Sequence, residues 1–236
     1  MTRPIYAVGD IHGQKTMLDD ALARIEDDDA GRNAPVVFLG DLVDRGPDSR
    51  GVIETLRSGR AAGRNWIVLR GNHDQMFLDF LDGHSDGRGW MGENLGGSET
   101  IASYGVTARA GTIDPAAARA AIPRAHHDFL SGLPFHHVDD GLLFVHAGIA
   151  PGVALEHQAK DDLIWIREPF LSWRGPHPWL VVHGHTPLHH PAHFGNRVDL
   201  DGGAGFGRPL VPAVFEGNDC CLLTKDGRTP LRPGDA

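Results

Sequence analysis

The chain has 236 residues, with 22 Lys and Arg against 31 Asp and Glu, which gives a formal net charge of −9 with histidine neutral. Because 41% of its residues are hydrophobic and 22% are charged, it can bury a sizeable core, and this composition excludes a disordered or fibrous chain. The acidic balance argues against nucleic-acid binding through a basic face. We expect a single domain over residues 1–236, to which any anionic substrate is attracted only locally.

The compartment is inferred from features that the sequence lacks. The N-terminal segment has no apolar run as long as a signal-peptide core, and no later stretch is apolar for long enough to span a bilayer. We expect a cytoplasmic protein without membrane contact, whose oligomeric state is left open. Cys220 and Cys221 are adjacent, which is not the spacing of a disulfide framework or a CxxC metal pair, and they are interpreted as strand residues.

Five short apolar runs occur along the chain, and each is too short to form a helix. They are rich in Val, Ile, Leu and aromatic residues without alternation, which is typical of strands buried on both faces. Helical patterns follow the first three and predict strand–helix units. The acidic residues 26–29 would oppose the helix dipole, so the first helix is expected to end before them. The apolar runs are 5–8, 36–39, 66–69, 142–145 and 179–182, and the helical patterns are 15–25, 49–56 and 73–81.

The segment 83–134 is rich in glycine and alanine and has no strong strand pattern. A helical stretch at 115–122 predicts a partly helical, cap-like insertion over the site. From residue 135 onward, turn signals between short apolar runs predict a mainly antiparallel second half. The elements together indicate the α/β fold class.

A polar turn that contains glycine follows each of the five strands. Ligands of open α/β sheets bind beyond the carboxyl ends of the strands, so these turns should converge on one site. The turns are GDIHG at 9–13, GDLVDRG at 40–46, RGNHD at 70–74, HAG at 146–148 and HGHTP at 183–187.

The turns hold six candidate metal ligands, which offer oxygen or imidazole nitrogen and no thiolate. Such ligands suit Mn, Fe, Zn, Ni or Co, with Mn²⁺ favoured. Six are too many for one catalytic ion with open positions, and they suit two ions about 3.5–4 Å apart that share a carboxylate, as in phosphatases and nucleases. Taken singly, each residue could instead be a helix cap or a turn residue, but this alternative would need five independent coincidences. The six are Asp10, His12, Asp41, Asn72, His146 and His185.

Together the five motifs resemble those of the metallophosphoesterases, and within them the phosphoprotein phosphatase group with its bacterial serine/threonine phosphatases. The resemblance extends from residue 9 to residue 187 and implies a four-layer αββα sandwich. It also implies two metal ions with Asp41 as their bridge. One ion would be bound by Asp10, His12 and Asp41, and the other by Asp41, Asn72, His146 and His185.

His73 follows Asn72 in the chain and must therefore lie near the metals. In the family this histidine is the general acid, held by the second Asp of the second motif, which is Asp44 here. The pairing is chemically favourable because a carboxylate raises the pKa of an imidazole and fixes its orientation. The alternative is that His73 only caps the following helix.

Three arginines, Arg45, Arg70 and Arg167, are candidates for phosphate binding, because a guanidinium can hold two phosphate oxygens at once. The first two lie in the motifs. Arg167 lies in a stretch that resembles the one supplying a substrate arginine in bacterial relatives, and its alternative is an exposed helix arginine. Trp90 and the stretch from residue 96 to Tyr104 resemble a loop of bacterial family members, and the sequence does not reveal its role.

The predicted reaction is dinuclear metal-dependent hydrolysis of a phosphomonoester by direct attack of a metal-bridging hydroxide, without a phosphoenzyme. The predicted substrate is phosphoserine or phosphothreonine, in a phosphorylated protein or a small phosphoester, because Asp44 is present to support an acid. The first alternative is a diadenosine tetraphosphate hydrolase of the same fold. Those enzymes carry Asp at the position of Asp74, where protein phosphatases usually have Glu, but they usually carry Ala at the position of Asp44. The second alternative is an inactive scaffold that binds phosphorylated partners.

Overall fold

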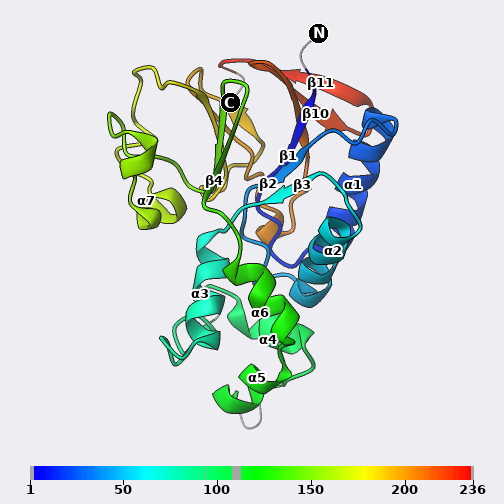
Figure 1. Cartoon of the computed structure of the whole chain (residues 1–236), viewed down its shortest axis with the longest axis vertical. Helices are drawn as coiled ribbons and strands as arrows, with labels where there is room; N and C mark the ends of the chain where they lie inside the picture. Colours follow the sequence, from blue (N-terminus) through cyan, green and yellow to red (C-terminus); the bar gives the residue numbers. More distant parts are fainter. Residues whose placement is uncertain (1–2, 93, 108–112, 235–236) are drawn as a thin grey trace.

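The computed structural model describes residues 3–92, 94–107 and 113–234. Within these residues the chain forms two β-sheets with helices on their outer sides, a mixed α/β fold consistent with the expected sandwich (Figure 1). The first sheet has the strand order β11-β10-β9-β1-β2-β3, and the second has the order β4-β5-β6-β8-β7. No helix of the described residues is both long enough and apolar enough to cross a membrane.

The elements have the following bounds. The first sheet contains β1 Ile5–Val8, β2 Val36–Phe38, β3 Trp66–Val68, β9 Ala213–Glu216, β10 Asp219–Thr224 and β11 Gly227–Leu231. The second contains β4 His136–Asp139, β5 Leu142–Val145, β6 Leu180–His183, β7 Ala192–His193 and β8 Arg197–Asp199. The helices are α1 Lys15–Asp29, α2 Ser49–Ala61, α3 Asn72–Leu81, α4 Gly97–Ser103, α5 Pro115–Ala121, α6 Arg124–Ser131 and α7 Lys160–Trp165, with short 3-10 helices η1 Leu155–His157 and η2 Ala204–Phe206.

Three hydrophobic clusters fill the spaces between four layers. In β1, Tyr6 and Val8 belong to the cluster under the helices, whereas Ile5 and Ala7 belong to the cluster between the sheets. The strands of the second sheet alternate in the same way, and their outer side chains pack in a third cluster around Phe170. Each central strand is thus buried on both faces, which explains why the sequence shows apolar runs without alternation.

The strands that precede the site are parallel in both sheets. β1 pairs with β2 and β2 with β3 in parallel, and β5, β6 and β8 do the same in the second sheet. The second half is expected from the sequence to be mainly antiparallel. This is correct for the pairing of β4, β7, β9, β10 and β11, but β5, β6 and β8 pair in parallel. The crossover from β5 to β6 contains the short helix α7, whose six residues gave no clear helical pattern. Parallel pairing brings the carboxyl ends of these strands to one edge, where the predicted turns meet.

Helix α1 continues to Asp29 instead of ending before the acidic run. Asp28 accepts bonds from Arg228 Nε and Nη2 at 2.8 and 2.7 Å and from the Tyr6 hydroxyl at 2.7 Å. These bonds lower the pKa of Asp28, with the Arg228 bond as the largest cause. The unfavourable charge at this helix end is therefore compensated by residues from β1 and β11, which lie far away in the sequence.

We expect Asp28→Asn to lower the free energy of unfolding by about 1 kcal/mol at pH 7, because it weakens a partly exposed, two-bond ion pair. The pKa of Asp28 is lower in the folded chain, so its contribution is full above the unfolded pKa of about 4 and is lost as the pH falls through the folded pKa. Urea denaturation of wild type and variant should therefore converge at acidic pH. Asp27→Asn, at an exposed neighbouring position, is the matched control. A stability difference that does not change with pH would contradict the ion-pair explanation.

The segment 83–134 is partly helical, and its residues 93 and 108–112 lie outside the described part of the chain. The predicted helix at 115–122 is α5. Helix α4 packs against α2, and α6 packs against both α2 and α3 (Figure 1). The insertion therefore extends the helical layer of the first sheet.

Candidate metal centre

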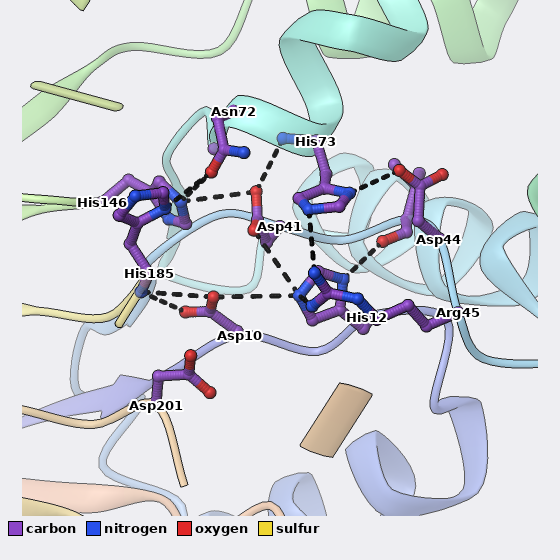
Figure 2. A network of polar contacts seen from close by, with 12 residues as sticks. Asp10, His12, Asp41, Asp44, Arg45, Asn72, His73, His146, His185 and Asp201 are labelled. Carbon is purple, nitrogen blue, oxygen red and sulfur yellow. Dashed lines mark hydrogen bonds and ion pairs between the residues drawn. The ribbon is translucent and has the colours of Figure 1, made fainter. Parts of the chain in front are cut away.

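The six predicted ligands lie together at the carboxyl edges of both sheets (Figure 2). The first sheet supplies those that follow β1, β2 and β3, and the second sheet supplies those that follow β5 and β6. Their exposed fractions lie between 0% and 6%, so the group is almost completely buried. The residues are Asp10 and His12 after β1, Asp41 after β2, Asn72 at the start of α3, His146 after β5 and His185 after β6.

Asp41 lies at the centre of this group. Its Oδ2 is 3.5 Å from His12 Nε2, and its Oδ1 is 3.4 Å from His146 Nε2. Two sets of side chains have ligand atoms within 4.8 Å of one another, and Asp41 belongs to both, once with His12 and His73 and once with His146 and His185. The carboxylate therefore faces two candidate metal positions, as a bridging ligand must.

The ring nitrogens of His146 and His12 show that the donor set fits cations. His146 Nδ1 lies 2.9 Å from the Leu39 carbonyl and must donate to it, since a carbonyl oxygen only accepts. Burial lowers the pKa of His146, so Nε2 of the neutral ring carries no proton. This Nε2 lies 2.9 Å from another acceptor, Asn72 Oδ1. His12 likewise bonds the Val43 carbonyl through Nδ1 at 2.9 Å and directs Nε2 into the site. Lone pairs that converge in this way are the arrangement that a divalent ion stabilises.

Buried carboxylates lead to the same conclusion. Burial, together with the carboxylates of Asp201 and Asp41, raises the pKa of Asp10 well above its usual range. Asp201 is only 4% exposed and lies beside Asp10 in Figure 2, although the sequence did not single it out as a site residue. Its signal was present in the pair of aspartates at 199 and 201, the first of which ends β8 and the second of which follows it. A surplus of buried negative charge of this kind favours binding of cations.

The backbone of the site is tightly packed, and parts of it adopt conformations that are rare for residues other than glycine. Gly71 and Gly184 leave room for carboxylates, since a Cβ at these positions would lie 2.2 Å from Asp41 Oδ1 and 2.1 Å from Asp10 Oδ1. Left-handed φ values at non-glycine residues store strain of roughly 1–3 kcal/mol each and are typical of functional sites. They occur at His12 (48°), Asp41 (50°), Asp44 (76°), Arg45 (66°) and His185 (67°).

His73 and Asp44 form a buried pair beside this group. His73 Nδ1 donates to Asp44 Oδ2 at 2.6 Å, and His73 Nε2 faces the site (Figure 2). Although burial acts to lower the pKa of His73, the carboxylates of Asp41 and Asp44 raise it overall. The structure thus brings the predicted pair together, with the second ring nitrogen, Nε2, directed toward the candidate metal positions (Figure 2).

Arg45 lies against this pair and the metal ligands. Its Nη1 is 2.5 Å from His12 Nε2, and its Nη2 is 3.2 Å from His73 Nε2. The exposed ring of Phe206 covers its guanidinium at 4.9 Å. Arg45 is therefore at the mouth of the site. Phe206 could not be identified as its neighbour from the sequence, because Phe206 lies in a glycine-rich stretch without a recognisable pattern.

The other two predicted arginines differ in position. Arg167 lies on the opposite side, where its Nη2 donates to the His185 carbonyl at 3.5 Å. Arg70 instead donates to the Leu130 and Ser131 carbonyls at 3.1 and 2.6 Å, and also to Gln75 Oε1 at 2.9 Å. It connects the end of β3 to α6, and its guanidinium is not directed at the ligands.

A groove of about 610 Å³ opens beside the site between α3 and α7. Trp165 stands at its edge, 44% exposed, and its ring contacts the ring of His185 at 5.9 Å. Arg70, Asp79, Phe135 and Lys160 also line the groove. Sequence reasoning missed Trp165, because an aromatic residue in a short helix has no distinguishing pattern.

The chain matches known proteins over most of its length. A family model described as calcineurin-like phosphoesterase matches residues 3–209. A serine/threonine-protein phosphatase 1 from Salmonella typhimurium is 31% identical in an alignment of 229 positions that covers 91% of this chain and 93% of that protein. A symmetrical bis(5'-nucleosyl)-tetraphosphatase from Burkholderia mallei is 32% identical in an alignment of 165 positions that covers 68% of this chain but only 48% of that protein.

Solved structures share the fold. One, assigned provisionally as a diadenosine tetraphosphatase, has a TM-score of 0.69 at 24% identity, and the match covers 99% of this chain and 96% of that protein's chain. A serine/threonine phosphatase from Saccharomyces cerevisiae has a TM-score of 0.59 at 15% identity and covers 97% of this chain and 76% of its own. At these identities the likeness concerns the architecture and carries no information on the substrate.

Proposed function

The chain belongs to the calcineurin-like phosphoesterase family and is a phosphoesterase, and from this premise we propose that it hydrolyses phosphoserine and phosphothreonine monoesters at a dinuclear metal centre. The observation that supports this substrate most is the buried pair of His73 and Asp44, joined at 2.6 Å beside Asp41. A serine alkoxide is a poor leaving group that needs a proton, whereas a nucleotide phosphate leaves with less help.

The metal ions are assigned to the two positions on either side of Asp41, with His73 kept as the acid and not counted as a ligand. We assign Asp10, His12 and Asp41 to one ion, and Asp41, Asn72, His146 and His185 to the other. When bound, two divalent ions lower the pKa of water to supply a nucleophile and neutralise charge on the phosphate. Oxygen and imidazole ligands without thiolate are compatible with Mn²⁺.

The remaining side chains bind the phosphate and move a proton. Arg45 on the His12 side and Arg167 on the His185 side hold phosphate oxygens. His73 donates its Nε2 proton to the leaving oxygen, and Asp44 keeps the ring in place through Nδ1. Arg70 has no phosphate contact in this proposal, because Gln75 accepts from its Nη1 and two backbone carbonyls accept from its Nη2.

The groove between α3 and α7 would hold the part of the substrate beyond the phosphate. Its cations, Arg70 and Lys160, are balanced by Asp79 and Asp161, which also line it. A groove with balanced charge suits a peptide better than a chain of four phosphates, which requires an excess of positive charge. This supports a phosphorylated protein or peptide as the substrate.

A diadenosine tetraphosphate hydrolase is the second candidate. The exposed rings of Trp165 and Phe206 lie on the His185 and Arg45 sides of the centre, and exposed aromatic rings can stack on nucleobases. Asp74, the residue that these hydrolases share with this chain, gives less support to this candidate than the sequence suggested. Its buried carboxylate accepts the Leu42 and Gly71 amides at 3.0 and 2.9 Å, so it braces two motif backbones and does not face the substrate side.

A panel of substrates tests the proposal. We expect a higher kcat/KM for phosphoserine and phosphothreonine peptides than for diadenosine tetraphosphate, measured as phosphate release and by nucleotide chromatography. Cleavage of the dinucleotide with untouched phosphopeptides would establish the second candidate. Stoichiometric binding of phosphopeptides without turnover of any substrate would establish the inactive scaffold.

Removal of metal should abolish hydrolysis. Chelation is expected to reduce activity to background, since a site of oxygen and imidazole ligands with open positions exchanges its ions readily. Adding back Mn²⁺, Fe²⁺, Zn²⁺, Ni²⁺ or Co²⁺ singly should restore activity, with Mn²⁺ the most effective. A chelated protein that is shown to be metal-free and yet retains full activity would refute the metal centre.

A further inference from the structure

The insertion at 83–134 reaches Asp44, the partner of the candidate acid His73, through two buried side chains. Trp90 Nε1 donates to Asp44 Oδ2 at 2.7 Å, and Thr100 Oγ1 donates to Asp44 Oδ1 at 2.7 Å. Trp90 is 4% exposed, and Thr100 and Asp44 are 0% exposed, so water does not compete for these bonds. Both oxygens of Asp44 are thus bonded from the insertion, and Oδ2 also accepts His73 Nδ1.

The hydrogens around Thr100 have only one consistent arrangement. Its hydroxyl has one proton, which goes to the Asp44 carboxylate, because an ionised carboxylate only accepts. The same oxygen therefore accepts the Asp44 amide at 2.8 Å and the Ser49 hydroxyl at 3.0 Å. Thr100 contacts both the side chain and the backbone of Asp44, a residue with the left-handed φ of 76°. One hydroxyl therefore fixes the position of the residue and the rotation of its carboxylate.

The indole of Trp90 is itself held rigidly. It stacks on Phe77 at 5.3 Å with an interplanar angle of 22°, and it contacts Phe80 at 5.3 Å. Gly97 approaches the ring so closely that a Cβ there would lie 2.4 Å from it. A Cβ on the preceding Gly96 would lie 2.4 Å from the amide nitrogen of Arg45. The two glycines thus let the insertion pack directly on the indole and on the second motif.

We propose that Trp90 and Thr100 are positioning residues for proton donation, which act by holding the Asp44 carboxylate in the orientation that His73 requires. This rests on the proposed function, in which His73 is the acid. It gives the insertion a role in the reaction, through a contact with the His–Asp pair and not with the substrate. A purely structural role would also explain the burial of both residues, so the test must separate the two.

The dependence of rate on the leaving group makes this separation. In Trp90→Phe, which keeps an aromatic ring and removes the N–H, we expect kcat to fall about 10-fold for a phosphoserine peptide and less than about 2-fold for nitrophenyl phosphate, whose leaving group needs little protonation. Trp66→Phe is the matched control, since Trp66 of β3 packs against Phe38 of β2, with ring centroids 5.5 Å apart, and has no hydrogen bond to Asp44. It should lose activity on neither substrate.

Combining the variant with loss of the acid completes the test. In a His73→Asn background, Trp90→Phe should lower kcat no further, because both changes remove the same step. An equal loss on both substrates, no loss, or a full additional loss in the double variant would overturn the proposal. If His73→Asn itself lowers kcat equally on both substrates, the assigned acid is wrong. That result is a failure of the proposed function, and it can be distinguished from a failure of the positioning role of Trp90.

Thr100 gives a second, independent measurement. Thr100→Val keeps the shape and removes the hydroxyl, and it should show the same leaving-group dependence as Trp90→Phe. Thr100→Ser, which restores the hydroxyl, should recover most of the lost kcat for the phosphoserine peptide. A serine variant as slow as the valine variant would overturn the role of Thr100. If Trp90→Phe does not fold, the valine and serine pair alone decides the proposal.

Discussion

Asp41→Asn should abolish phosphatase activity, with a fall in kcat of at least about 10³-fold. Changes to groups that only support a ligand already reduce metal affinity or activity by about 10–100-fold, and this change alters the residue that faces both metal positions. An amide also removes one negative charge from the site to which we assign two divalent ions. Metal analysis of the purified variant should show that both ions bind weakly.

A comparison with Asp10→Asn makes this prediction specific. Asp10 lies 3.9 Å from His12 Nε2 through Oδ2 and is assigned to one ion only. Its variant should keep one of the two ions and more residual activity than Asp41→Asn. If Asp41→Asn bound two ions and turned over at the wild-type rate, Asp41 would not bridge the ions.

His73→Asn should lower kcat for phosphoserine peptides by roughly 10²–10³-fold, in the range usual for a general acid. Both metal ions should remain bound, because His73 is not among the assigned ligands. Metal analysis and kinetics on the same preparation check the two statements together. The amide nitrogen of asparagine can donate from near the position of His73 Nδ1, so the buried Asp44 carboxylate keeps a hydrogen-bond donor.

The leaving group provides the control for His73→Asn. Nitrophenolate is a stable anion, so the loss of kcat on nitrophenyl phosphate should be much smaller than on the peptide. A loss of the same size on both substrates would mean that His73 supports the site without donating the proton. The role of Asp44 as its partner would then be wrong as well.

The convergence of the six candidate ligands could be predicted from the sequence because its signal is local. Each ligand follows a buried strand directly, so the position of the strand also places the ligand, and the parallel order of β1, β2 and β3 brings their ends together. The His73–Asp44 pair was predicted from the family resemblance rather than from spacing. In the structure the pair is joined at 2.6 Å.

Other features were beyond the sequence because they depend on distant contacts. The extension of α1 requires Arg228, 200 residues away from Asp28. The orientation of Arg70 depends on carbonyls of α6, about 60 residues later. The bonds from Trp90 and Thr100 to Asp44 bring together segments that no local pattern relates. These interactions belong to tertiary packing, which periodicity and strand-end motifs do not encode.

The division of the ligands between two sheets has a consequence for how the protein is made. β1 lies between β2 and β9, so this strand has both its neighbours only after residues 213–216 have left the ribosome. Contacts so distant in sequence form slowly during folding. Until then, Asp10, His12 and Asp41 are not held in place beside His146 and His185, which complete the centre. We expect metal loading to follow completion of the chain, so that an unfinished chain is neither loaded with ions nor active.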